Sequence, residues 1–248
     1  MTPEEIERYA RHIVLREIGG PGQNKLLSAK LLCIGAGGLG SSALLYLGAA
    51  GVGRIGIVDD DEVSLSNLQR QVLHATDSIG TLKTASAKQA LARVNPHVEV
   101  VEHHFRLEEH NIGDVISGYD LVLDGTDNFT TRYLVNAACV RAKTPLISAA
   151  MSQWEGQISL YDPANGGPCY QCVFPEAPAD GLAPNCAQAG VMGALAGVMG
   201  SMMAGEAIKQ ITGAGQVLRE EILIYDSLYG ETRKLKTSKR DTCPICSQ

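Results

Sequence analysis

The chain has 248 residues, of which 45% are hydrophobic and 19% charged, so it can bury the core of one large or two modest domains. Its net charge of −6 argues against a general nucleic-acid-binding protein, which would carry a basic surface. The start, MTPEEIERYARHIVL, contains neither a basic leader nor an uninterrupted apolar stretch. We therefore expect no signal peptide and a cytoplasmic protein.

The first predicted element is a helix over residues 2–15. Thr2 and Glu5 have the spacing of a capping box, and Pro3 lies at the first helical position. The glycine-rich stretch GGPGQNK, residues 19–25, is expected to break the chain after this helix.

Strand-like and helix-like stretches then alternate. We expect strands over residues 31–34, 55–58, 98–101, 121–123 and 146–148, and helices over 38–51, 83–94 and 128–141. Short apolar runs separated by helices are typical of a parallel sheet covered on both faces. The pattern predicts a doubly wound, Rossmann-like α/β fold whose ligand lies at the carboxyl ends of the strands.

The pattern changes after residue 150. GQISLYD and EILIYDSLYGETRKLKT look like antiparallel strands that continue the sheet, and no linker marks a boundary. We therefore predict a single domain, 1–248, with a nucleotide-binding half, 1–150, and a second half, 151–248. The uncharged stretch at 189–205 is rich in Gly and Ala, which favours a buried helix over a membrane span.

A glycine turn follows the first predicted strand. Gly35, Gly37 and Gly40 match the G-x-G-x-x-G spacing of a dinucleotide-binding turn, which reports a tight strand-to-helix connection before it reports a ligand. Asp59 lies 19 residues after Gly40, where an acid at a strand end could hold a ribose hydroxyl. This much is compatible with NAD.

Amide, cationic and acidic side chains come next. Asn67, Arg70 and Lys83 suit a triphosphate better than a pyrophosphate already bound by a helix N-terminus. Asp124 and Asp127 end a strand, where a carboxylate could hold Mg²⁺ bridging phosphates. Structural interpretations stay open: the cations could be solvated helix charges, and either aspartate could cap the following helix.

Two pairs of cysteines share the C-x-x-C spacing. Cys169 and Cys172, together with Cys243 and Cys246, predict a four-thiolate tetrahedral zinc site. Four protein ligands leave no open position, so the zinc would be structural. The alternative is a redox-active C-x-x-C pair.

These motifs together resemble a known family. GAGGLGS, DDDEVSLSNLQRQ, GTDN, GQI, CYQC and CPIC are similar to segments of the ATP-dependent sulfur-carrier adenylyltransferases of the MoeB/ThiF type, bacterial relatives of ubiquitin-activating enzymes. The resemblance covers nearly the whole chain and implies ATP in place of NAD. Such enzymes join the C-terminal carboxylate of a small ubiquitin-fold carrier, which ends in Gly-Gly, to the α-phosphate and release pyrophosphate.

The resemblance also implies roles for individual residues. Gly38 would contact the phosphates and Asp59 the ribose, with Asn67, Arg70 and Lys83 on the triphosphate, and Asp127, beside Asn128, on Mg²⁺. Arg11 matches an arginine that reaches into the partner's site of a homodimer. Cys186 matches a position that links covalently to the carrier in thiamine-type relatives, and is otherwise an inert loop thiol. The second half, 151–248, would bind the carrier and the zinc.

Several alternatives remain at this stage. The carrier could serve molybdopterin synthesis, which the short chain and SLSNLQRQ favour, or thiamine synthesis. A separate protein is expected to donate the sulfur, and neither nucleic acid nor membrane is expected as a partner. Two functions of other classes compete with adenylation: an NAD-dependent oxidoreductase and a non-enzymatic scaffold that binds zinc and nucleotide.

Overall fold

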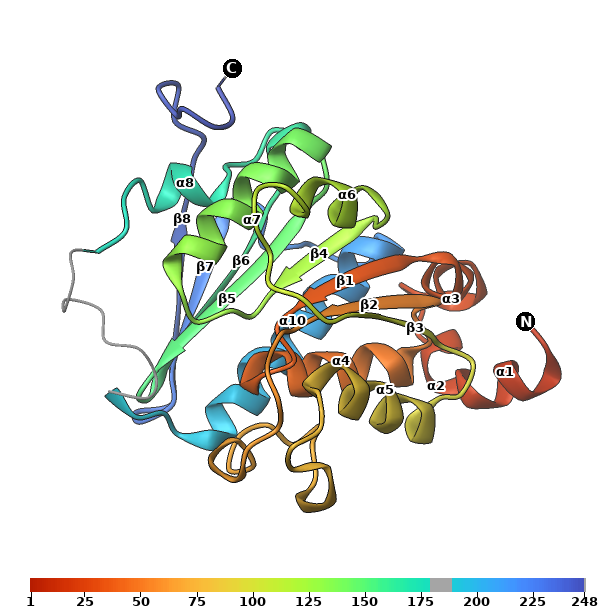
Figure 1. The fold of residues 1–248 in the computed structure, drawn as a ribbon. Helices are drawn as coiled ribbons and strands as arrows, with labels where there is room; N and C mark the ends of the chain where they lie inside the picture. The colour runs from red at the N-terminus through yellow and green to blue at the C-terminus, as the bar shows by residue number, and fades with distance from the viewer. Residues whose placement is uncertain (179–188, 248) are drawn as a thin grey trace.

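The centre of the molecule is one mixed β-sheet of eight strands (Figure 1). The computed structural model describes residues 1–178 and 189–247. The strand order is β3-β2-β1-β4-β5-β6-β7-β8; the first five strands are parallel, and β6, β7 and β8 are antiparallel to their neighbours. The strands are β1 (Lys30–Ile34), β2 (Arg54–Val58), β3 (Glu99–His103), β4 (Leu121–Asp124), β5 (Leu146–Ser152), β6 (Glu155–Tyr161), β7 (Glu221–Asp226) and β8 (Glu231–Lys236). This sheet confirms the predicted fold class.

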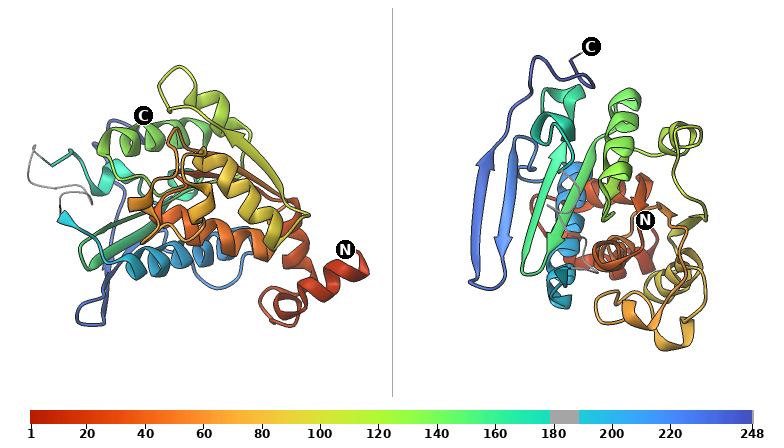
Figure 2. Two further views of the ribbon diagram at one scale, coloured as in Figure 1. Left: turned by 60° about the horizontal axis from the view of Figure 1, so that its bottom comes forward. Right: turned by 60° about the vertical axis from the view of Figure 1, so that its left-hand side comes forward.

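Helices cover both faces of the parallel strands because successive side chains of a strand point to opposite sides. In β1, Leu31 and Cys33 enter the core beneath α4, α5 and α10, whereas Leu32 and Ile34 enter a second core beneath α6 and α7. These helices are α4 (Gly38–Ala50), α5 (Lys83–Val94), α6 (Ile112–Ser117), α7 (Phe129–Ala142) and α10 (Gly193–Thr212), and a short helix, α8 (Tyr170–Val173), follows β6. Figure 1 shows the two helical layers, and Figure 2 shows β7 and β8 extending beyond them.

The uncharged, glycine-rich stretch forms most of α10, which packs against α4. Met199 is fully buried in the core that α10 shares with the sheet. A Cβ added at Gly200 would come within 2.2 Å of both the carbonyl oxygen of Leu39 and the hydroxyl of Ser42, so the two helices touch through their backbones. The buried-helix prediction is confirmed, and none of the helices in the described ranges combines the length and apolarity that crossing a membrane requires.

The N-terminal region differs from the prediction in two ways. The capping box of Thr2 and Glu5 is present, but the helix is divided at Tyr9 into α1 (Pro3–Arg8) and α2 (Ala10–Ile13). The glycine-rich stretch that was expected to break the chain instead begins α3 (Gly19–Ser28).

Tertiary packing explains the helix at α3. Gly22 lies against Thr212 at the end of α10, and the Lys25 ammonium donates a hydrogen bond of 2.9 Å to the carbonyl oxygen of Thr212. Gln23 is fully buried, and its Nε2 donates a hydrogen bond to the carbonyl oxygen of Ala50. Pro21 is tolerated in the first turn because its missing N–H has no helical partner there. Contacts with distant residues thus outweigh the weak local helix propensity.

The chain changes direction at β1. The path from β1 through α4, β2, α5 and β3 adds strands on one side, and α6 then carries the chain to β4 on the other side. The sequence analysis did not predict α6 or the short 3-10 helices η1 (Leu65–Asn67), η2 (Thr76–Ser78) and η3 (Pro163–Asn165). In open α/β sheets such a point leaves a crevice outside the carboxyl ends of the strands.

Candidate nucleotide-binding site

A cavity of about 720 Å³ opens at this crevice. Its wall includes the segments that follow β1, β2, β3 and β4, together with the end of β5 and the starts of α4 and β6. All seven residues that the sequence analysis assigned to the nucleotide line it: Gly38, Asp59, Asn67, Arg70, Lys83, Asp127 and Asn128. The fold therefore brings together side chains that are spread over more than ninety positions of the chain.

The glycine turn forms the floor of the cavity. Gly35 has a φ of +91°, which L side chains rarely adopt. A Cβ at Gly40 would lie 2.0 Å from the carbonyl oxygen of Gly35, so only glycine allows the turn to fold back on itself. The turn leads into the first residues of α4, whose N–H groups have no helical acceptor and carry the positive end of the helix dipole. Such a terminus attracts phosphate groups.

Asp59 at the end of β2 anchors the turn from the side. Its Oδ2 accepts a hydrogen bond of 2.8 Å from the N–H of Ala36, and its Oδ1 accepts one from the N–H of Asp61. Burial of the side chain, which is 8% exposed, raises the pKa of Asp59, and nearby Lys83 opposes this effect. The carboxylate oxygens retain lone pairs for a donor such as a ribose hydroxyl.

The three polar residues after β2 lie on one side of the cavity. Arg70 is half-buried, and its Nη1 donates to the carbonyl oxygen of Ser66. The Asn67 side chain accepts a hydrogen bond from the N–H of Ser64, so it also shapes its own loop. Lys83 is buried, with its Nζ 2.6 Å from Asp61 Oδ2 and 4.0 Å from Asp59 Oδ1. The ammonium is therefore held by carboxylates at the cavity wall and is not a solvated helix charge.

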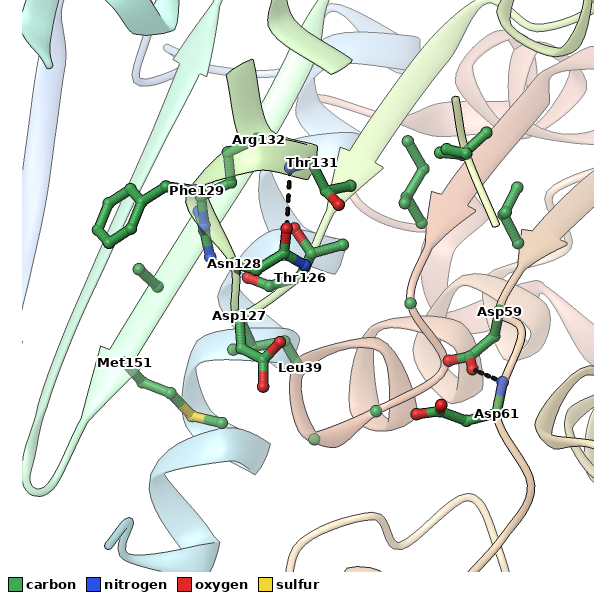
Figure 3. A pocket seen from close by; sticks show the side chains of 18 of the residues that line it. Leu39, Asp59, Asp61, Thr126, Asp127, Asn128, Phe129, Thr131, Arg132 and Met151 are labelled. Carbon is green, nitrogen blue, oxygen red and sulfur yellow. Dashed lines mark hydrogen bonds between the residues drawn. The ribbon is translucent and has the colours of Figure 1, made fainter. Parts of the chain in front are cut away.

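The two candidate magnesium ligands after β4 have different environments. Asp124 is fully buried, and its carboxylate accepts hydrogen bonds from Thr126 and from the Ser148 hydroxyl, so it shapes the turn. Asp127 is exposed and accepts no hydrogen bond from any described residue. Figure 3 shows its carboxylate projecting into the cavity, across from Asp59. Asn128, and neither aspartate, caps α7 by accepting from the N–H of Thr131.

The structure adds two residues that the sequence analysis missed. Arg132 is buried at the cavity wall and donates to the Ser148 hydroxyl and to the carbonyl oxygens of Thr126 and Ala149, so it ties the β4 turn to β5. Its only signal was an arginine one turn into a predicted helix. Gln71 also lines the cavity, and its buried Oε1 has no partner among the described residues. An unpaired buried polar atom is rare in a native fold, and a bound ligand would supply the missing partner.

Arg11 does not belong to this cavity. It is exposed on α2 and lies next to Tyr9, whose ring packs on Gly51 at the C-terminal end of α4 and whose hydroxyl accepts a hydrogen bond from Asn95. The cavity adjoins the other end of α4. Since α4 has 13 residues, its two ends are about 20 Å apart, farther than an arginine side chain reaches.

The four predicted zinc ligands form one buried cluster, whereas Cys186 lies outside the described residues. The Sγ atoms of Cys169 and Cys172 are 3.8 Å apart, those of Cys169 and Cys243 3.6 Å, and those of Cys172 and Cys246 3.4 Å. A tetrahedron of Zn–S bonds of about 2.3 Å has edges of about 3.8 Å. Thiols of this number and spacing fit a structural zinc ion, and the cluster fastens the segment after β8 to α8.

The cavity as a whole suits a nucleotide with an anionic tail. The helix terminus, Arg70 and Lys83 supply positive potential, Asp59 offers acceptors, and Asp127 offers a free carboxylate to a cation. No histidine or cysteine of the described ranges lines the cavity, so these residues contain no Cys–His pair for nucleophilic catalysis there.

Comparisons with known proteins agree with this geometry. The ThiF family model matches residues 9–245. The chain is 47% identical over 248 residues to the adenylyltransferase and sulfurtransferase MOCS3 of Aedes aegypti, but it spans only 56% of that protein's length. It is 44% identical to the sulfur carrier protein adenylyltransferase of Thermus thermophilus, covering 99% of this chain and 92% of that protein. A crystal structure of E. coli MccB with ATP superposes with a TM-score of 0.81 at 25% identity, covering 92% of this chain and 70% of that one. The chain belongs to the ThiF family.

Proposed function

We propose that the protein catalyses the ATP-dependent adenylation of the C-terminal glycine carboxylate of a small ubiquitin-fold sulfur-carrier protein. The observation that carries this proposal is the single cavity in which the glycine turn, Asp59, Arg70, Lys83 and Asp127 converge. A relative that aligns with nearly the full chain is named sulfur carrier protein adenylyltransferase, and a structural neighbour, MccB, has a crystal structure with ATP.

Each polar group then has a role. The N–H groups at the start of α4 and the side chains of Asn67, Arg70 and Lys83 hold the triphosphate, while Asp59 accepts hydrogen bonds from the ribose. Asp127, which is free of other partners among the described residues, would hold Mg²⁺, and the ion would supply positive charge next to the phosphates. Gly38 leaves room for the phosphates, because an added Cβ would lie 3.1 Å from both Ala196 and Met151 and would crowd this part of the cavity.

The reaction needs positioning and charge more than proton transfer. A carboxylate oxygen of the carrier attacks the α-phosphorus, a new P–O bond forms, and the bond to the β-phosphate oxygen breaks to release pyrophosphate. The carboxylate is already ionised at pH 7, so no general base is required. Negative charge grows on the departing pyrophosphate, and Arg70 and Lys83 are placed to stabilise it.

The carrier would approach along the antiparallel strands. Gln157 of β6 lines the cavity and pairs with Ile224 of β7, which in turn pairs with Arg233 of β8. Because paired residues share a face of the sheet, this row leads outward from the cavity to the half-exposed Leu235 two positions along β8. A substitution Leu235→Asp is expected to weaken carrier binding while leaving ATP binding unchanged, measured by calorimetry with each ligand.

A homodimer would complete the site. Arg11 lies near the end of α4 that is about 20 Å from the cavity of its own chain, so it could serve only the cavity of a partner. On α10, Gly197 and Gly205 face open space, where a second helix could pack closely, as small residues allow. The zinc cluster would keep its structural role in each subunit.

Carrier-dependent ATP–pyrophosphate exchange tests the proposed reaction. We expect Arg70→Ala and Asp127→Ala each to reduce exchange at least ~10²-fold, as removed transition-state electrostatics should. Arg93→Ala and Asp114→Ala are matched controls, since neither residue lines the cavity. Undiminished exchange in both cavity variants would refute the site assignment, and NAD binding without exchange would favour the oxidoreductase.

Mixing two inactive variants tests the composite site. Arg11→Ala and Arg70→Ala should each be nearly inactive, and a heterodimer of the two would hold one intact site. At equal mixing about half the dimers are hybrids, so roughly a quarter of wild-type activity should return. No recovery after demonstrated subunit exchange would exclude a role for Arg11 in the partner's site.

The pathway depends on the carrier. We favour the carrier of molybdopterin synthesis, because the segment SLSNLQRQ resembles that type, and keep the thiamine carrier as the alternative. Pulldown of each purified carrier in the presence of ATP separates them. Cys186→Ala should retain ATP–pyrophosphate exchange in either case, since adenylation precedes any step at a thiol.

A further inference from the structure

A buried histidine supports the glycine turn from behind. His74 is 6% exposed and does not line the cavity. Its Nε2 lies 2.9 Å from the carbonyl oxygen of Ala36, and its Nδ1 lies 2.8 Å from the hydroxyl of Ser86 on α5. The histidine thus joins α5 to the residue between the first two glycines of the turn.

The partners fix the state of the ring. A carbonyl oxygen can only accept, so Nε2 carries a proton, and Nδ1 then accepts from the Ser86 hydroxyl in the neutral ring. Burial lowers the pKa of His74, and nearby Lys83 adds to this effect, whereas the Ala36 carbonyl and Asp59 oppose it. The neutral form therefore predominates near pH 7.

The hydrogen bond to Ala36 also orients a neighbouring group. In a trans peptide the C=O and the N–H point in opposite directions, so fixing the Ala36 carbonyl toward His74 directs the N–H of Gly37 away from it. Gly37 lines the cavity, whereas Ala36 is fully buried. Among the described residues no acceptor is bonded to this N–H.

Asp59 holds the backbone N–H of Ala36, on the other side of that residue from His74. Its Oδ2 accepts from the N–H of Ala36, so both hydrogen-bonding groups of Ala36 are held by buried side chains. The turn cannot rotate either peptide without breaking one of these bonds. The donor of Gly37 is therefore aimed before any ligand arrives, which removes the cost of ordering it on binding.

We propose that His74 is a positioning residue that aims the Gly37 N–H at a phosphate oxygen of the bound nucleotide. The proposal rests on the proposed ATP-dependent function. It assigns to His74 a contribution to phosphate binding and none to recognition of the nucleoside.

Two substitutions separate this role from a general structural one. His74→Leu introduces an apolar side chain of similar size that cannot donate, whereas His74→Gln can present an amide N–H to the Ala36 carbonyl. His103→Gln is the matched control, because His103 also donates or accepts through Nε2 to a buried partner, Tyr119, but does not touch the turn. Each protein is titrated by calorimetry with ATP and Mg²⁺, and separately with adenosine.

We expect His74→Leu to weaken ATP binding about tenfold, the effect of one hydrogen bond to a charged group, and to change adenosine binding less than twofold. His74→Gln should recover most of the ATP affinity, and His103→Gln should match wild type with both ligands. Equal losses for ATP and adenosine, or ATP affinity unchanged in His74→Leu, would overturn the proposal. Failure of the wild-type protein to bind ATP would instead refute the proposed function itself.

Discussion

The close crossing of α10 and α4 predicts how one added methyl group will change the free energy of unfolding. Gly200→Ala adds a Cβ that would lie 2.2 Å from the Leu39 carbonyl oxygen, about 1 Å closer than an ordinary contact. The carbonyl belongs to the backbone of α4 and cannot rotate away, so the helices must separate. Such overpacking costs typically 1–3 kcal/mol, and the loss outweighs the gain of about 1 kcal/mol that alanine brings to a helix.

Gly113 provides the matched control. It is an exposed glycine of α6, and a Cβ there meets nothing within 4 Å. Gly113→Ala should therefore stabilise by up to about 1 kcal/mol, and Gly200→Ala should destabilise by up to about 2 kcal/mol, so the same substitution gives opposite signs. In a chain of this length each kcal/mol moves the midpoint of thermal unfolding by about 2–4 °C.

Urea and thermal unfolding measure both variants, and the affinity for ATP gives a second readout. Leu39 lies in the first turn of α4, so displacement of that turn should also raise the Kd for ATP in Gly200→Ala and leave it unchanged in Gly113→Ala. If Gly200→Ala proved as stable as Gly113→Ala, the close backbone contact between the helices would be wrong.

Three further predictions concern charge and metal. Asp61→Asn frees the Lys83 ammonium from a carboxylate 2.6 Å away and removes a negative charge that would repel the phosphates. The KM for ATP should therefore fall severalfold, and a rise would mean that Asp61 binds a cation. Burial lowers the pKa of His74 in the folded protein below its ordinary value of 6.5, so the unfolded chain binds more protons just below that pH. The free energy of unfolding in urea should therefore fall more from pH 7.5 to pH 5.5 for wild type than for His74→Gln. Freshly purified protein should contain one zinc per chain by elemental analysis, and Cys243→Ser should lower its unfolding midpoint while retaining measurable exchange activity; absence of zinc would refute the cluster's role.

The central strands β1, β2 and β4 were predictable because they are buried on both faces and therefore read as apolar runs, whereas the edge strand β3 is only partly buried. The helix α5 was predicted with both of its ends, since Leu82 and Asn95 flank a clear helical pattern. In contrast, α3 was hidden by its glycines and proline, because Gln23 and Lys25, which stabilise it, donate hydrogen bonds to segments distant in the sequence. Local pattern carries no information about such contacts.

The site shows the same division. Residue type and position along the chain were enough to collect seven cavity residues. They could not separate Asp124 from Asp127, which lie three positions apart but differ in burial and in the groups that donate hydrogen bonds to them. Nor could they reveal Arg132, because the backbone carbonyls to which it donates are brought together only when β4 and β5 pair. Roles that consist of supporting other groups become visible only in three dimensions.

The position of α10 in the chain has a consequence for synthesis. The five parallel strands are complete at Ser152, but one face of their core needs α10, which ends at Thr212, 60 residues later. At ribosomal rates of about 5–20 residues per second, the part of that core next to α4 and β5 that α10 covers stays exposed for roughly 3–12 s. During that interval the nascent chain has an incomplete nucleotide-binding fold with exposed apolar side chains. Fragments truncated before α10 should for the same reason aggregate, so the nucleotide-binding half cannot be produced as a separate module.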